Sequence, residues 1–125
     1  MQNNEKPLVS VVIPCYNHEK FVQDCIQSVI DQTYENIELI IIDDGSKDNS
    51  VKVIQELADK YGFTFIHRPN KGLSATLNEG IRLSKGKYFS AIASDDILFL
   101  EKIEKLKEYK TVLIDNVVTG KVKVS

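Results

Sequence analysis

The chain has no tryptophan, one methionine and only two cysteines among its 125 residues. Two cysteines cannot build a disulfide framework, so Cys15 and Cys25 are expected to be buried free thiols in a reducing compartment. No apolar run approaches the roughly 20 residues that a membrane-spanning helix needs. Residues 1–6 are polar and contain no apolar signal core. These absences predict a cytoplasmic protein.

Several short signatures are also missing. The sequence contains no G-x-x-x-x-G-K-[ST], no G-x-G-x-x-G and no G-x-S-x-G. Their absence disfavours a P-loop nucleotidase, a dinucleotide-binding domain and a hydrolase nucleophile elbow. The net charge is −2, and the basic residues are scattered apart from a modest cluster at 102–110. Nucleic-acid binding needs a concentrated basic surface, so no nucleic-acid partner is expected.

The composition that remains, 42% apolar and 27% charged, is that of one globular domain. We assign it to residues 8–125, after an N-terminal tail at 1–7. Apolar, β-branched runs predict strands at 8–14, 37–42, 63–67 and 88–93. Helical periodicity predicts helices at 19–32, at about 50–62, capped by Asp48 or Asn49, and at 73–86, with Leu73, Leu77 and Ile81 on one face. A charged helix near 100–109 and a strand near 112–118 would follow.

Strands that alternate with helices predict an α/β fold, in which a mainly parallel sheet is covered by helices on both faces. Such sheets bind ligands at the carboxyl ends of their strands. Asn17 follows the first strand, Asp43 and Asp44 follow the second, and Asp95 and Asp96 follow the fourth. The binding site is therefore expected at this edge of the sheet.

Two pairs of adjacent carboxylates stand out. Asp95 and Asp96 would repel each other unless a cation neutralises them, and oxygen ligands suit Mg²⁺ and Mn²⁺. The alternative is a helix N-terminus, where aspartate is favoured by the helix dipole. Asp44 could accept hydrogen bonds from a ribose or a base, with Gly45 allowing a tight turn close to the ligand. The alternative for this second pair is a turn followed by a helix cap.

Two further segments offer binding groups. In Pro14-Cys15-Tyr16-Asn17, the tyrosine could stack on a base and the asparagine could donate and accept; the alternative is a loop with a buried tyrosine. In the turn at 70–72, Lys71 could pair with phosphate at a helix N-terminus, or could simply be solvated. The two histidines, at positions 18 and 67, have no metal-ligand spacing and are expected in surface or loop roles.

Taken in order, these segments resemble a known family. The stretch VSVVIPCYNHEKFVQDCIQSVIDQTYENIELIIIDDGSKDNS is similar to the opening of family 2 glycosyltransferases, which have the GT-A fold. The stretch NKGLSATLNEGIRLSKGKYFSAIASDDI resembles the family's next section, which ends in its metal-binding motif. The resemblance covers residues 9–105. It implies a three-layer α/β/α sandwich, a nucleoside diphosphate sugar as donor, most often a UDP-sugar, and Mn²⁺ or Mg²⁺ as cofactor.

The resemblance also implies roles for single residues on the side of the nucleobase. Pro14, Tyr16 and Asn17 would line the pocket for the base and the ribose, with Glu19 close by. Asp44 would contact the uracil or the ribose, whereas its neighbour in the chain would support the turn.

On the side of the diphosphate, the resemblance implies that Lys71 and Gly72 lie beside the base and the phosphates. Asp95 would face the ribose or the sugar, and Asp96 would be the direct metal ligand. The family's Asp-x-Asp appears here as Ser94-Asp95-Asp96, a variant without the first aspartate.

The family's acceptor-binding half, which supplies a general base, has no counterpart in the sequence, so the catalytic residue stays unassigned. One expectation is a metal-dependent, inverting hexosyltransferase of polysaccharide biosynthesis, acting on a saccharide or lipid-linked acceptor, with membrane association through partners. The alternatives are a truncated nucleotide-sugar-binding module without transfer activity, or a subunit that needs a partner. An open sheet edge would favour a homodimer.

Overall fold

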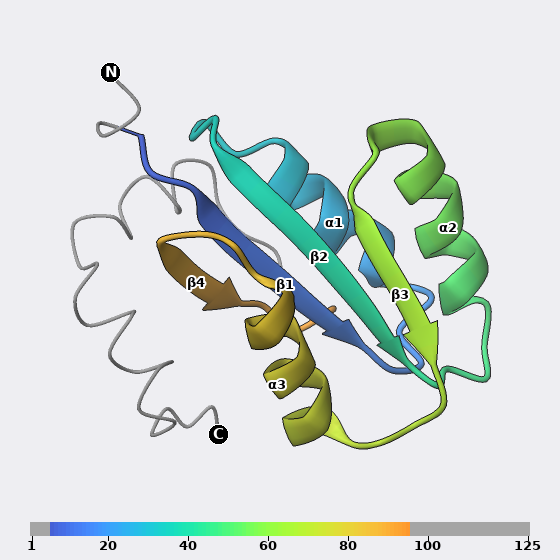
Figure 1. Cartoon of the computed structure of the whole chain (residues 1–125). Coiled ribbons are helices and arrows are strands. Elements are labelled where there is room, and N and C mark those ends of the chain that lie inside the picture. Colours follow the sequence, from blue (N-terminus) through green and yellow to red (C-terminus); the bar gives the residue numbers. More distant parts are fainter. Residues whose placement is uncertain (1–5, 96–125) are drawn as a thin grey trace.

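The computed structural model describes residues 6–95 (Figure 1). Asp96, and the helix and strand predicted near 100–109 and 112–118, lie outside the described residues. The order of elements is β-α-β-α-β-α-β, as the sequence predicts. The elements are β1 (Val9–Cys15), α1 (Val22–Ile30), β2 (Ile37–Asp44), α2 (Ser50–Tyr61), β3 (Thr64–Arg68), α3 (Leu73–Leu83) and β4 (Tyr88–Ala91).

The four strands form one sheet with the order β3-β2-β1-β4, and every neighbouring pair is parallel. The two central strands are buried along most of their length, because helices cover both faces of a parallel sheet. β1 pairs with β2 from Val9↔Ile37 to Cys15↔Asp43, and β2 pairs with β3 as far as Asp44↔Arg68. The carboxyl ends of β1, β2 and β3 therefore lie side by side (Figure 1).

The predicted three-layer α/β/α architecture is confirmed. α1 and α2 lie behind the sheet in Figure 1, and α3 lies in front of it. The larger core fills the space under α1 and α2, where Ile13, Ile41 and Ile54 are fully buried. The smaller core lies on the α3 face, around Val12 and Ile42. No helix of the described part is long and apolar enough to cross a bilayer. Cys15 and Cys25 are buried and free, as expected.

Helix α3 buries only the middle residue, Leu77, of the leucine and isoleucine stripe that the sequence predicts. Leu73 and Ile81 are exposed, and the buried residues are Thr76, Leu77 and Gly80. The reason is close packing: a β-carbon at Gly80 would lie 2.6 Å from Val12 Cγ1, so the helix approaches the sheet where its side chains are small.

Two predicted helix boundaries are also wrong. α3 ends at Leu83, not at Gly86, and Gly86 instead passes close to β1, where a β-carbon would lie 2.6 Å from Ser10 Oγ. α1 begins at Val22 and not at residue 19, because the N–H groups of Phe21 and Val22 both donate to the His18 carbonyl in a preceding turn.

Candidate functional site

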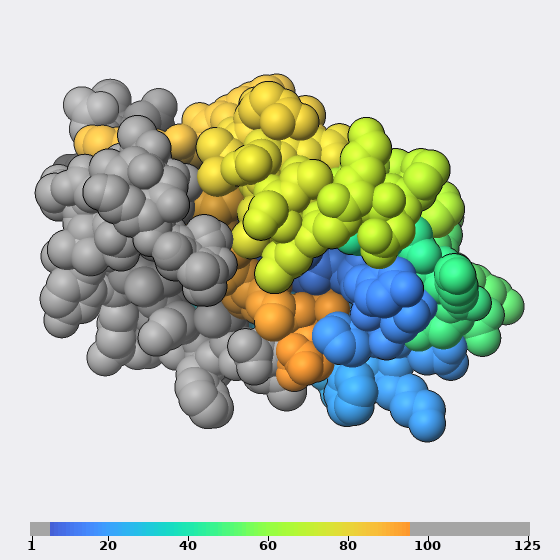
Figure 2. Space-filling model, turned by 90° about the horizontal axis from the view of Figure 1, so that it is seen from below, coloured from blue at the N-terminus to red at the C-terminus, as the bar shows by residue number. Residues whose placement is uncertain are grey.

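A cavity of about 460 Å³ opens at the carboxyl ends of the strands. Figure 2 looks onto this side, where the blue segment after β1, the orange segment that leads to residue 95 and the yellow-green start of α3 meet. The cavity is walled by the end of β1 and the loop after it, by the end of β2, by the turn before α3 and its first turn, and by the segment after β4. The residues that line it are Pro14, Cys15, Tyr16, His18, Asp44, Asn70, Gly72, Leu73, Thr76, Ala93 and Ser94.

The loop after β1 is tied to the loop after β2 by side chains of both. Asn17 has the left-handed φ of 56°, a conformation that asparagine tolerates better than most residues. Its Oδ1 accepts the Lys47 N–H at 2.7 Å, and its own N–H donates to Ser46 Oγ at 2.8 Å. Glu19 Oε1 accepts the Asn49 N–H at 2.9 Å. Asn17 and Glu19 thus hold the two loops together, and neither is among the residues that line the cavity.

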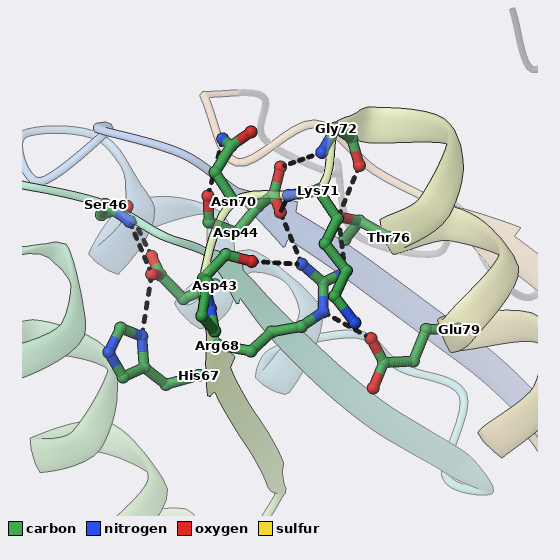
Figure 3. Close-up of polar contacts among 11 residues, drawn as sticks. Asp43, Asp44, Ser46, His67, Arg68, Asn70, Lys71, Gly72, Thr76 and Glu79 are labelled. Atoms are coloured by element: carbon green, nitrogen blue, oxygen red, sulfur yellow. Dashed lines mark hydrogen bonds and ion pairs between the residues drawn. The ribbon is translucent and has the colours of Figure 1, made fainter.

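Asp43 and Asp44 point to opposite faces of the sheet, as successive residues of a strand must. The buried Asp43 carboxylate accepts the Ser46 N–H at 2.9 Å and the Ser46 hydroxyl at 2.5 Å, and its Oδ2 lies 3.2 Å from His67 Nδ1 (Figure 3). It therefore braces the turn at 45–46, the structural role expected for it. The N-cap of α2 is Asn49, which makes no side-chain cap hydrogen bond, and Asp48 before it accepts the Ser50 N–H at 2.9 Å through Oδ1.

Asp44 lies on the α3 face and is 5% exposed. Its Oδ1 accepts the Lys71 N–H at 2.7 Å and Arg68 Nη1–H at 2.5 Å, and its Oδ2 accepts the Gly72 N–H at 3.0 Å (Figure 3). Burial by itself would raise the pKa of Asp44. The hydrogen bonds from Lys71, Arg68 and Gly72 outweigh burial and hold that pKa below its usual value. Asp44 is therefore a carboxylate at neutral pH.

The geometry of the turn before α3 requires two glycines, one in the turn itself and one in the loop after β2 that touches it. Gly72 has a φ of 96° and a ψ of 161°, a backbone region that is essentially restricted to glycine. Gly45 has a φ of 82°, and a β-carbon on it would lie 2.6 Å from the Asn70 backbone nitrogen. Asn70 Nδ2 in turn donates to the Asp44 carbonyl at 2.9 Å. The loop after β2 and the turn before α3 are thus in contact at the edge of the cavity.

The segment after β4 forms the wall opposite to Asp44. His18 Nδ1 and Ser94 Oγ share a hydrogen bond of 2.5 Å, and His18 Nε2 lies 3.9 Å from Asp95 Oδ2. The Cys15 thiol lines the same wall. Burial raises its pKa, and hydrogen bonds with the hydroxyls of Ser50 and Ser94 oppose that shift only in part. The thiol is therefore neutral near pH 7.

The structure brings most of the predicted binding residues to one place. Pro14, Tyr16, Asp44 and Gly72 line the cavity. Asp95 lies beside it, because its carboxylate is 3.9 Å from the ring of His18, which also lines the cavity. Lys71 contributes its backbone N–H to Asp44, and its side chain has no hydrogen bond or ion pair with any residue between 6 and 95.

Sequence reasoning missed Arg68 of β3, which contacts the cavity residue Asp44, and Thr76 of α3, which itself lines the cavity. An arginine directly after the strand predicted at 63–67, in a chain with an acidic pair after the preceding strand, is the signal that could have indicated the first of them. Nothing in the sequence pattern marks the second.

Within residues 6–95 no group of three or more histidine, cysteine, aspartate or glutamate side chains could by itself hold a metal ion. Asp95 is the described carboxylate beside the cavity that has room for a cation, because its side chain is half-exposed and its contact with His18 is long. Asp96 follows it directly in the sequence. Two adjacent carboxylates suit Mg²⁺ or Mn²⁺, which complete their shell with oxygen ligands from water or phosphate. Of these two carboxylates the structure describes Asp95 alone, and its oxygens are of the ligand type that such an ion takes.

The structure is similar to solved glycosyltransferases. TarS (residues 1–349) of S. aureus in complex with UDP-GlcNAc has a TM-score of 0.74 at 22% sequence identity, over 81% of this chain and 30% of that one. A mannosyltransferase from Pyrobaculum calidifontis in complex with GDP-Man and Mn²⁺ has a TM-score of 0.69 at 20% identity, over 74% of this chain and 28% of that one. At these identities the likeness shows that the fold is that of GT-A glycosyltransferases.

Closer relatives come from bacteria. An uncharacterized glycosyltransferase of Rickettsia prowazekii is 42% identical over 103 residues, which are 82% of this chain and 32% of the relative. Glycosyltransferase GlyG of Streptococcus pneumoniae is 41% identical over 101 residues, which are 79% of this chain and 34% of the relative. The chain thus spans about a third of the length of these curated relatives. Because the model of glycosyl transferase family 2 matches residues 10–124, nearly the whole sequence, the chain belongs to that family.

Proposed function

We propose that this chain binds a nucleoside diphosphate sugar, most often a UDP-sugar. It would be the donor-binding half of a metal-dependent, inverting glycosyltransferase. The observation that carries the proposal is the cavity at the carboxyl ends of the strands, where Asp44 and the N-terminus of α3 lie together. A helix N-terminus favours an anion, and an ionised aspartate accepts N–H and O–H groups. The complexes of similar proteins with UDP-GlcNAc and with GDP-Man support the same class of ligand.

The base and the ribose would bind between the end of β1 and Asp44. The half-exposed Tyr16 ring offers a flat surface for the base, next to Pro14. Asp44 would accept a hydrogen bond from the base or the ribose. Asn17 and Glu19 would act indirectly, because their side-chain oxygens already accept backbone N–H groups of the loop after β2.

The diphosphate would lie near Lys71, Gly72 and the first turn of α3, with Asp95 toward the ribose or the sugar. Asp95 and Asp96 would hold Mn²⁺ or Mg²⁺. When bound, such an ion stabilises the negative charge that a departing nucleoside diphosphate gains. The acceptor would be a saccharide or a lipid-linked sugar of polysaccharide synthesis, reached at the cytoplasmic face of a membrane through partner proteins.

A second candidate is a nucleotide-sugar-binding module that transfers nothing on its own. It is favoured by the chemistry of Asp44, the acidic residue that lines the cavity. A general base needs a pKa near the working pH, and the pKa of Asp44 is lowered by its hydrogen bonds. Asp44 is therefore not assigned as the catalytic base.

The two candidates are separated by binding and turnover. We expect UDP with Mn²⁺ to raise the melting temperature of the wild type by mass action, and Asp96→Ala to lose the part of the effect that depends on Mn²⁺. Asp59→Ala is the matched control, since it removes an exposed carboxylate of α2. A wild type that shows no Mn²⁺-dependent binding of UDP would refute the proposal. Sugar transfer, or more than trace hydrolysis of a UDP-sugar, would exclude the second candidate.

A further inference from the structure

Arg68 is the one arginine among the described residues whose side chain is nearly buried, with 11% of it exposed. It is the last residue of β3 and the register partner of Asp44 in β2. Its guanidinium donates to Asp44 Oδ1 through Nη1 at 2.5 Å and to Glu79 Oε1 through Nε at 2.7 Å (Figure 3). The cation thus sits between two carboxylates from different elements, one at the end of β2 and one on α3.

Two further donors of Arg68 are also used within the protein. Nη1 donates to the Pro69 carbonyl at 3.1 Å, and Nη2 donates to Thr76 Oγ1 at 2.8 Å. A guanidinium has five N–H groups, and these contacts use four of them. Most N–H donors of Arg68 therefore bind protein groups, and the residue is poorly placed to bind a phosphate directly.

Thr76 links Arg68 to the start of α3. Its hydroxyl accepts from Arg68 Nη2 and donates to the Gly72 carbonyl at 2.9 Å, while the Gly72 N–H donates to Asp44. Gly72 is thus held from both sides by groups that Arg68 contacts. The network fixes the carboxylate and the turn before α3 relative to one another through protein groups alone.

The same network determines how much of Asp44 is left for a ligand. A carboxylate has about four lone-pair sites. Oδ1 already accepts from Lys71 N–H and Arg68 Nη1, whereas Oδ2 accepts only from Gly72 N–H. Oδ2 therefore keeps room for one further donor.

We propose that Arg68, held by Glu79 and Thr76, is a positioning residue for nucleotide binding: it presets Asp44 and the turn before α3 without touching the nucleotide. This inference rests on the proposed function of the cavity. The planar fork of arginine suits the role, because Asp44, Glu79 and Thr76 lie around it in different directions and a lysine ammonium presents no such fixed pattern.

The test combines Arg68→Met and Arg68→Lys with a surface control. Lys6→Met removes a cation from the exposed pair with Glu35. UDP affinity in Mn²⁺ is measured by calorimetry, and amide hydrogen exchange is measured without ligand. We expect Arg68→Met to weaken UDP binding on the order of 10- to 100-fold, as loss of a supporting contact typically does. Arg68→Lys should restore part of that loss, and Lys6→Met should bind as the wild type does.

Exchange separates positioning from a merely structural role. In Arg68→Met the amides of Lys71 and Gly72, which donate to Asp44, should lose protection selectively. The Ile92 amide, which donates to the Val12 carbonyl, should keep it. Equal loss of protection at Ile92, or a UDP affinity within twofold of the wild type, would overturn the inference.

If Arg68→Met does not fold, Glu79→Ala decides the matter, because Glu79 is 24% exposed and its removal frees Arg68 Nε alone. The inference then requires a smaller loss of UDP affinity with the same selective exchange, and wild-type behaviour of Glu79→Ala would overturn it. A wild type that fails to bind UDP would count against the proposed function alone, since the exchange pattern is measured without ligand.

Discussion

Helix α3 is attached to β2 at both of its ends. Before the helix, Asp44 accepts the N–H groups of Lys71 and Gly72. Beyond it, Glu38 Oε1 accepts the Lys85 N–H at 2.8 Å. Asp44 and Glu38 are six residues apart on β2, an even number, so both side chains lie on the α3 face of the sheet.

The two attachments differ in whether a cation pairs with the carboxylate and in the groups around it. Glu38 also accepts the Ser10 hydroxyl at 2.6 Å, and Ser10 Oγ accepts the Gly86 N–H at 2.8 Å. Among residues 6–95 no cation pairs with Glu38, whereas Asp44 has a buried arginine as partner. Asp44 also lines the cavity. We call the attachment beyond α3 the Glu38 end and the attachment before α3 the Asp44 end. We infer that the Glu38 end contributes to stability alone and that the Asp44 end contributes to both stability and ligand binding.

The largest effect is expected from Asp44→Asn. The amide nitrogen of asparagine cannot accept an N–H, and Arg68 keeps Glu79 alone as a counter-charge among the described residues. Breaking a buried ion pair by removing one partner costs at most about 3–5 kcal/mol of folding free energy. Urea denaturation should show this loss, together with at least a hundredfold weaker UDP binding. Glu38→Gln is the matched control. If it proves as damaging as Asp44→Asn in both measurements, the two ends do not differ as inferred.

A change at the other attachment should separate stability from binding. In Gly86→Ala the new β-carbon would lie 2.7 Å from the Ser10 backbone nitrogen and 2.8 Å from the Leu8 carbonyl oxygen, so backbone has to move. Such overpacking costs about 1–3 kcal/mol of folding free energy. The UDP affinity of the folded variant should stay within about twofold of the wild type, a difference below 0.5 kcal/mol in binding free energy.

Gly62→Ala is the control for Gly86→Ala. Gly62 has a φ of 81° but nothing within 4 Å of a β-carbon, so it reports the conformational cost of a left-handed residue without a clash. A UDP affinity that falls in Gly86→Ala but not in Gly62→Ala would show that the Glu38 end is coupled to the cavity after all.

Acid should weaken the Asp44 end. The folded-state pKa of Asp44 is lower than its ordinary value of 3.8, so its contribution to stability is fully present above that value. The contribution is lost as the pH falls through the folded-state pKa, with a slope of at most about 1.4 kcal/mol per pH unit for one proton. The difference in unfolding free energy between wild type and Asp44→Asn should therefore narrow below about pH 4. Asp48, whose pKa is also lowered, is present in both proteins and cancels. A constant difference down to pH 2.5 would contradict the assignment.

The sequence was sufficient for the architecture because each element carries its own signal. Strands β1 and β2 are mostly apolar and β-branched and α1 has a helical stripe, so the alternation and the parallel sheet could be predicted from local pattern. Boundaries that depend on distant contacts could not. Gly86 resembles a helix stop in sequence, but its position is decided by how closely it passes Ser10 of β1.

The residues of the candidate site also fall into those that a local pattern indicates and those that depend on distant contacts. Asp44 and Gly72 could be singled out because a carboxylate after a strand and a glycine before a helix are local features. The roles of Arg68 and His18 depend on which strands are neighbours. Arg68 meets Asp44 only through the register of β2 and β3, and His18 meets Ser94 only because β1 lies beside β4. No local pattern carries that information.

The smallest effect is expected from Lys71→Ala, which tests whether the backbone or the side chain matters at the Asp44 end. The Lys71 N–H remains available to Asp44 in this variant, and the exposed ammonium has no partner among the described residues, so the unfolding free energy should change by less than about 0.5 kcal/mol. An exposed ammonium near a phosphate typically contributes about 0.2–1 kcal/mol, so UDP binding should weaken no more than about fivefold, and less in high salt. Calorimetry at two salt concentrations measures both effects. A loss of a hundredfold at 150 mM salt would mean that the lysine side chain, rather than the turn that Asp44 holds, dominates the binding of the diphosphate.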